Sequence, residues 1–83
     1  MNPTREEQAV VDKALSVGEQ VKLTKTGTEE DIGTINLGID VLTTWASICH
    51  IGCTEEEQRQ IKTAKTRLEE YQYFAYHTVF SQR

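Results

Sequence analysis

Cys49, His50 and Cys53 are the residues of this chain whose types and spacing come nearest to metal or catalytic chemistry. Structural zinc needs four ligands, and this one turn of chain supplies at most three of them. A cysteine nucleophile would need a third group to orient His50, and none is evident. We therefore predict a small buried residue at Cys49, a turn residue at Cys53, no bound metal or cofactor, and no enzyme. His77 is expected to pack among aromatic residues.

The polar segment from Thr24 to Thr28 is a second candidate site, because it lies just before an expected helix. Its hydroxyls, its lysine and the amides of a helix start are groups that bind anions. The Gly-Lys-Ser/Thr order of a Walker motif is absent. The alternative interpretation is an ordinary polar loop that ends in a threonine cap. Further basic residues occur between Gln58 and Leu68, a stretch without acids: Arg59, Lys62, Lys65 and Arg67.

Length and charge limit what these groups can do. The chain has 83 residues, of which 37% are hydrophobic, so a monomer would have a thin core. Nine basic residues against 13 acidic ones give a net charge of −4, which argues against binding to DNA or RNA polymers.

There is no secretory signal and no run of ~20 apolar residues. We expect a cytoplasmic protein that contacts no membrane and has reduced thiols.

Three threonines predict the helices that position these groups, because each is followed three residues later by an acid. They are Thr4, Thr28 and Thr54. The first helix is expected over residues 5–17, with Gly18 ending or fraying it. A connection follows over 18–28, in which Val21 and Leu23 allow a short extended piece. The other two helices are expected over 29–49 and 55–80. Their short link predicts an antiparallel hairpin, and thus a single all-α domain over residues 1–83.

Apolar residues repeat at heptad spacing along both hairpin helices. The seam of the second helix is Ile32, Ile35, Ile39, Leu42, Ala46 and Cys49, and that of the third is Ile61, Ala64, Leu68, Tyr71, Ala75 and Thr78. The second helix also contains Gly33 and Gly38, which either allow a close approach or are tolerated on an exposed face.

Five of the six aromatic residues lie within ten positions of the third helix, and they do not share one face. Tyr73, Tyr76 and Phe80 form a stripe beside the seam, which we call the aromatic stripe. A helix that is apolar on two sides needs two neighbours, so we predict self-association. The alternative is that the first helix covers the stripe.

Hairpin geometry also predicts where the basic residues lie relative to one another. A symmetric antiparallel hairpin puts residue 28 near residue 75 and Arg67 opposite Asn36. Lys25 and Arg67 would then lie about two helical turns apart in one chain. They would converge only across a subunit interface.

Residues 64–75 resemble the closing helix of the phage anti-CBASS and Thoeris anti-defence hairpin family, Ala-x-Thr-Lys-Leu-Glu-Glu-Ala-x-x-Trp-Ala-Asn. The match covers about a sixth of the chain, with Arg67 in place of the lysine and Phe74 in place of the tryptophan. Tyr71 and Tyr76 depart from the small residue and the asparagine of the pattern. The identical positions are Ala64, Thr66, Leu68, Glu69, Glu70 and Ala75.

This resemblance implies a non-catalytic sponge, a homohexamer that captures cyclic di- or trinucleotide immune signals at its subunit interfaces. Arg67 and Lys25 would bind phosphates, and a tyrosine or an aliphatic side chain would cover a base. The ligand-binding residues expected on this basis are Val11, Lys25, Thr26, Gly27, Thr28 and Arg67. One alternative is a small phage inhibitor that binds a host protein through the aromatic stripe. Another is a structural or assembly helper that binds no ligand.

Overall fold

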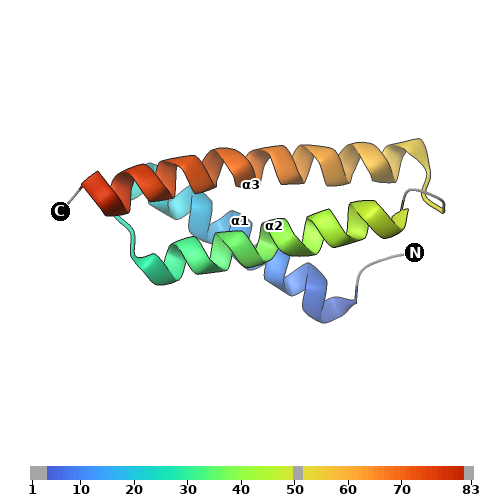
Figure 1. Cartoon of the computed structure of the whole chain (residues 1–83), viewed down its shortest axis with the longest axis horizontal. Helices are drawn as coiled ribbons and strands as arrows, with labels where there is room; N and C mark the ends of the chain where they lie inside the picture. Colours follow the sequence, from blue (N-terminus) through green and yellow to red (C-terminus); the bar gives the residue numbers. More distant parts are fainter. Residues whose placement is uncertain (1–3, 50–51, 82–83) are drawn as a thin grey trace.

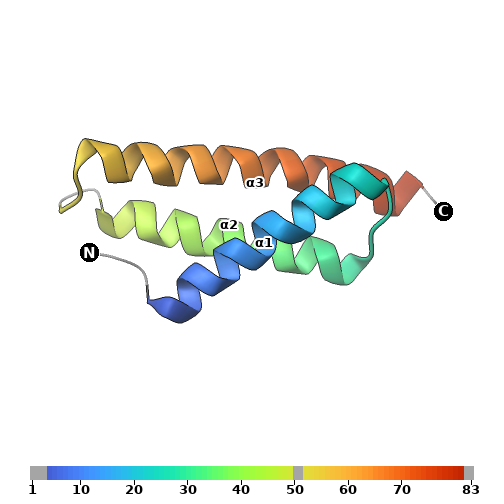
Figure 2. The ribbon, with the colours of Figure 1, turned by 180° about the vertical axis from the view of Figure 1, so that it is seen from behind.

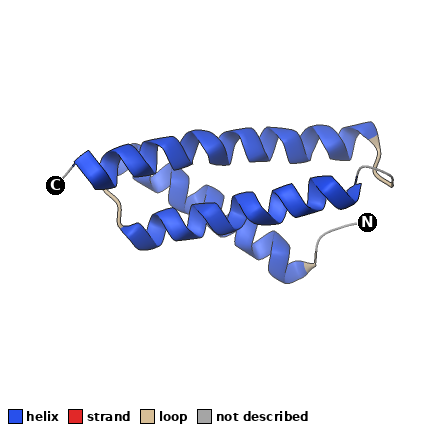
Figure 3. Ribbon diagram, viewed as in Figure 1, coloured by secondary structure: helices blue, strands red, loops and turns tan. Residues whose placement is uncertain are grey.

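Three helices make up the part of the chain that the computed structural model describes, which is residues 4–49 and 52–81. They are α1 (Arg5–Thr24), α2 (Glu29–Cys49) and α3 (Glu55–Ser81). Helices α2 and α3 run antiparallel, and α1 crosses them obliquely on one side (Figures 1 and 2). Among the described residues only helices and short connections occur (Figure 3). Each helix packs against the other two, so the predicted all-α class and the hairpin are confirmed.

The helices begin at the predicted threonines. The Glu7 amide donates to Thr4 Oγ1 at 3.1 Å, and the Glu7 carboxylate accepts from the Thr4 amide at 3.0 Å. The start of α2 has the same reciprocal pair, because the Asp31 amide donates to Thr28 Oγ1 at 3.2 Å and the Thr28 amide to Asp31 Oδ2 at 2.9 Å. These bonds satisfy amides that have no partner within the helix.

Helix α1 is longer than the sequence predicts. The expected end at Val17 and the expected connection over 18–28 are wrong, because the helix continues to Thr24. Gly18 does not end it, since the bare backbone at this position lies directly against the ring of Tyr71 in α3. The short extended piece at Val21 is wrong as well. That residue is helical and only 3% exposed, so its burial stabilises the last turn of α1.

Lys25 ends α1 in a left-handed conformation with φ 57°. Its amide donates to the carbonyl of Val21 at 2.8 Å, and Thr24 Oγ1 donates to the carbonyl of Gln20 at 2.9 Å. A left-handed residue is a common helix stop. Four residues, Lys25–Thr28, therefore make the whole connection to α2.

The core follows the two predicted seams and adds one face of α1. Its most deeply buried large side chains are Ile35, Leu42, Cys49 and Leu68. Small residues let α1 approach closely, since a Cβ added at Gly38 would lie 2.5 Å from the Cβ of Ala14. The missing side chain of Gly38 therefore allows α1 to pack closely against α2.

The register of the hairpin differs from the symmetric one. Asn36 bonds to α3 through Gln72, whose Nε2 donates to Asn36 Oδ1 at 2.6 Å, and through the hydroxyl of Tyr76 at 3.4 Å. The prediction that Arg67 lies opposite Asn36 is therefore wrong by more than one helical turn. Toward the other end of the hairpin, Cys49 of α2 borders the same cavity as Ile61 of α3.

Helix α2 is long and apolar enough to cross a membrane by length and composition, contrary to the expectation from the sequence. Helices at the core of soluble proteins pass the same test, and α2 contributes Ile35 and Leu42 to the bundle core. Only 28% of its most apolar window is buried in this chain. The large apolar side chains of Leu37 and Ile48 in α2 are exposed in this chain.

Candidate anion-binding site

The amides of the segment from Thr24 to Thr28 are largely occupied within the chain. The Thr26 amide donates to Thr24 Oγ1 at 3.3 Å, and the Thr28 amide donates to Asp31 Oδ2 at 2.9 Å. The carboxylate of Asp31 thus lies where the sequence suggests a bound anion. Two further acids in the first turn of α2 add negative charge there. The geometry therefore does not favour an anion bound by Thr26, Gly27 and Thr28.

Two of the predicted ligand residues have packing roles in this chain. Val11 is 4% exposed and belongs to the core, so its side chain does not offer a surface for a base. Gly27 lies beneath neighbouring side chains, and a Cβ there would be 3.3 Å from Val21 and 3.5 Å from Val79.

Arg67 and Lys25 border different cavities. This agrees with the prediction that the two residues do not converge within one chain. Arg67 lines a shallow cavity of about 310 Å³ with Leu15 and Arg59, and another of about 370 Å³ with Thr66 and other α3 residues. Their convergence across a subunit interface stays a prediction.

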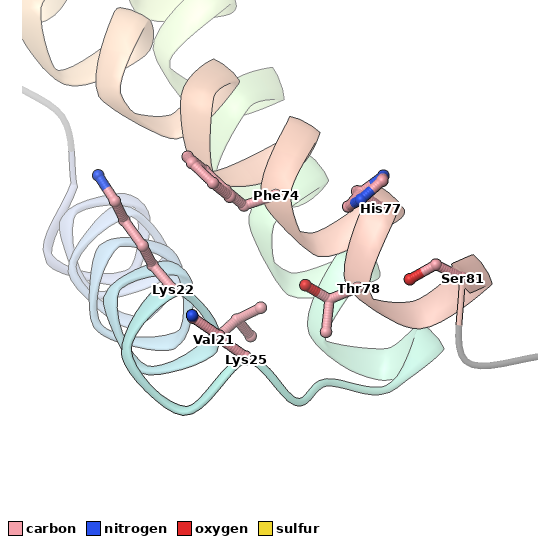
Figure 4. A pocket seen from close by; sticks show the side chains of 7 residues that line it. All are labelled: Val21, Lys22, Lys25, Phe74, His77, Thr78 and Ser81. Atoms are coloured by element: carbon pink, nitrogen blue, oxygen red, sulfur yellow. The ribbon is translucent and has the colours of Figure 1, made fainter.

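Lys25 instead borders a cavity of about 350 Å³ between the last turn of α1 and the last turns of α3. In Figure 4 the side chains of Lys22 and Lys25 come from the end of α1, and those of Phe74, His77, Thr78 and Ser81 come from α3. We call this the α1–α3 cavity, and its lining residues are Val21, Lys22, Lys25, Phe74, His77, Thr78 and Ser81. Ammonium and hydroxyl groups around an aromatic ring suit a ligand that combines phosphate with a flat base.

The two lysines of this cavity differ in their partners. Lys22 Nζ lies 2.9 Å from Glu70 Oε1 and 5.1 Å from the centre of the Phe74 ring. The hydrogen bond and the negative charge of Glu70 raise the pKa of Lys22. Lys25 makes no ion pair with any described residue, so it is the ammonium better placed to bind an added anion.

The ion pair predicts a pH-dependent contribution to stability. Because the folded pKa of Lys22 is raised above 10.5, the contribution is present below that pH and lost as pH rises through the raised pKa. We expect Glu70→Gln to lower the urea midpoint slightly at neutral pH, since both side chains are half exposed. The gap between variant and parent should close above pH 10.5. A gap that widens there would contradict this assignment.

His77 packs against an aromatic residue, as predicted. Its ring stacks on that of Tyr73, with centres 6.4 Å apart and planes 5° from parallel. Its place beside the α1–α3 cavity was not predicted. One face of α3 carries the residues that line this cavity, because their spacing repeats every three or four positions: Phe74, His77, Thr78 and Ser81. The sequence pattern alone does not indicate a cavity there, since the opposite side is formed by the end of α1, which reaches Thr24 only in the structure.

The expectation of reduced thiols is wrong for this structure, in which Cys49 and Cys53 form a disulfide. Their Cα atoms lie 5.0 Å apart, within the range that a disulfide spans. Cys49 is buried at the end of α2 and Cys53 lies in the link, as predicted for each. His50 lies outside the described residues.

No protein-family model matches this chain, and no curated protein or solved structure is significantly similar to it.

Proposed function

We propose that this protein is a non-catalytic sponge that sequesters cyclic di- or trinucleotide immune signals and so blocks anti-phage signalling in the host cytoplasm. The observation that carries the proposal is the α1–α3 cavity, which brings Lys25, hydroxyls and the Phe74 ring together. A cyclic oligonucleotide presents the same pairing of charge and flat surface, two or three phosphates with their bases.

Different groups of the cavity bind different parts of the ligand. The ammonium of Lys25 and the hydroxyls of Thr78 and Ser81 bind a phosphate, and the Phe74 ring packs against a base. These few contacts need no basic surface overall, so a net charge of −4 is compatible with them. Since such contacts do not track a polymer backbone, we propose no DNA or RNA partner.

A cavity of about 350 Å³ in one chain lies at the lower end of small-molecule sites and covers only part of such a ligand. We propose that a homohexamer completes the site, with Arg67 of another subunit on a second phosphate. Exposed apolar side chains support this assembly, because Leu37 is 58% exposed, Ile48 is 50% exposed and Tyr73 is 71% exposed. Such surfaces commonly mark protein interfaces.

Titration calorimetry with a panel of cyclic di- and trinucleotides tests the proposal. We expect Lys25→Ala to weaken binding by roughly tenfold or more, because a charged hydrogen bond contributes about 1.5–3 kcal/mol. Lys13→Ala removes the same charge from the exposed face of α1 and should leave affinity unchanged. Absence of heat with every nucleotide on folded protein would refute the sponge, and a monomeric native mass would refute the shared site.

The exposure of the aromatic stripe supports a second candidate, a phage inhibitor that binds a host protein. Tyr76 and Phe80 are 41% and 47% exposed, and their rings stack with centres 5.7 Å apart. Exposed aromatic residues are typical of protein interfaces. On this interpretation Tyr76→Ala abolishes the anti-defence activity, while Arg67→Ala and Lys25→Ala leave it intact.

A further inference from the structure

Three metal-binding side chains meet where α2 ends and α3 begins. The sulfurs of Cys49 and Cys53 and a carboxylate oxygen of Glu57 all lie within 4.8 Å of one another. Cys49 is buried, and the other two are partly buried. The sequence alone suggests donors from one turn, whereas Glu57 comes from the first turn of the next helix.

Backbone and side-chain bonds hold these three donors in place. The Cys53 amide donates to the carbonyl of Cys49 at 3.1 Å, which holds Cys53 beside the end of α2. Gln58 Nε2 donates to the carbonyl of Cys53 at 3.4 Å. The hydroxyl of Thr54 donates to the carboxylate of Glu57 at 3.1 Å and so orients it. Bonds of this kind raise metal affinity by limiting the positions that the ligands adopt.

We propose that reduction of the Cys49–Cys53 disulfide creates a site for one thiophilic divalent cation of the Zn²⁺ class, bound by both thiolates and Glu57. Reduction takes two electrons and two protons from a cellular thiol pair, which is oxidised to its own disulfide. The cation then displaces the two thiol protons. Sulfurs on one zinc lie about 4 Å apart, a spacing that Cα atoms 5.0 Å apart readily allow.

The surroundings favour this cation and leave room for a fourth ligand. Three protein donors leave one position of a tetrahedral zinc open to water. A cavity of about 310 Å³ borders Cys49 and connects it to the surface. Two thiolates and one carboxylate around a divalent cation carry a net charge of −1, and Lys62 and Lys65 line the same cavity. Their charges partly neutralise the loaded site.

Cobalt titration of the full chain tests the proposal, because tetrahedral Co²⁺ with thiolate ligands has a charge-transfer absorption band. In phosphine reductant without oxygen, we expect saturation at one Co²⁺ per chain and displacement by Zn²⁺. The oxidised protein should give no band, since a disulfide offers no thiolate. A reduced protein that is folded by circular dichroism and gives no band would overturn the site.

A matched pair of variants tests the third ligand. Glu57→Gln should weaken Co²⁺ binding by roughly tenfold or more, since loss of even an outer-sphere partner costs about 10–100-fold. Glu56→Gln removes the same charge one residue earlier, at an exposed position, and should bind as the parent does. Equal affinity of the two variants would remove Glu57 from the site. Cys53→Ser should lose about half of the charge-transfer intensity, and an unchanged band would exclude Cys53 as a ligand.

Discussion

Leu68→Ala is expected to lower the free energy of unfolding by about 2–5 kcal/mol. The side chain of Leu68 is fully buried, and it lies where all three helices meet. A Cβ added at Gly38 of α2 would be 3.1 Å from Leu68 Cδ1 and 2.5 Å from the Cβ of Ala14 in α1. Because three backbones surround this position, the structure has little freedom to collapse around the missing methyl groups.

Urea denaturation of parent and variants at one shared protein concentration measures this loss, because self-association would make the apparent stability depend on concentration. Leu23→Ala is the matched control, since the same side chain is 73% exposed on α1. We expect it to change stability by no more than about 0.5 kcal/mol in the monomer. Similar losses for both variants would contradict the placement of Leu68 in the core.

Gly18→Ala is expected to destabilise the protein by about 1–3 kcal/mol, although alanine is the better helix former. A Cβ at this position would lie 2.6 Å from the Cβ of Tyr71, an atom next to the backbone that cannot rotate away. Either α1 must move off α3 or the tyrosine must leave its place in the core. Both movements separate packed surfaces along the line where the two helices touch.

Gly33→Ala is the matched control for this substitution, because a Cβ there has no other atom within 4 Å. Without a clash only helix propensity acts, and we expect a gain of about 1 kcal/mol. The two variants are thus expected to have opposite signs in the same denaturation assay. A gain at Gly18 would show that α1 and α3 are not in close contact there.

Local patterns in the sequence were sufficient to predict where the helices start and which of their faces form the core. The pairs Thr4–Glu7 and Thr28–Asp31 form the predicted bonds because capping involves atoms only three residues apart. The seam positions Ile35 and Leu68 are buried, as their heptad spacing predicts. These features depend on helix periodicity, which any short stretch of chain reveals.

Contacts between residues far apart in the sequence determined the length of α1 and the surroundings of Lys25. Gly18 resembles a helix end in isolation, yet the ring of Tyr71, far along the chain, packs on it and the helix continues. That longer helix brings Lys25 to the α1–α3 cavity and leaves the amides before α2 to Asp31.

Residue types and spacing thus identified Lys25 and the cysteine pair as chemically notable. The α3 residues near them became visible only in three dimensions: His77 lines the same cavity as Lys25, and Glu57 lies beside the cysteines. The physical reason is that helix periodicity and caps are encoded locally. The length of α1 and the register of the hairpin, in contrast, depend on which side chains fit together across helices.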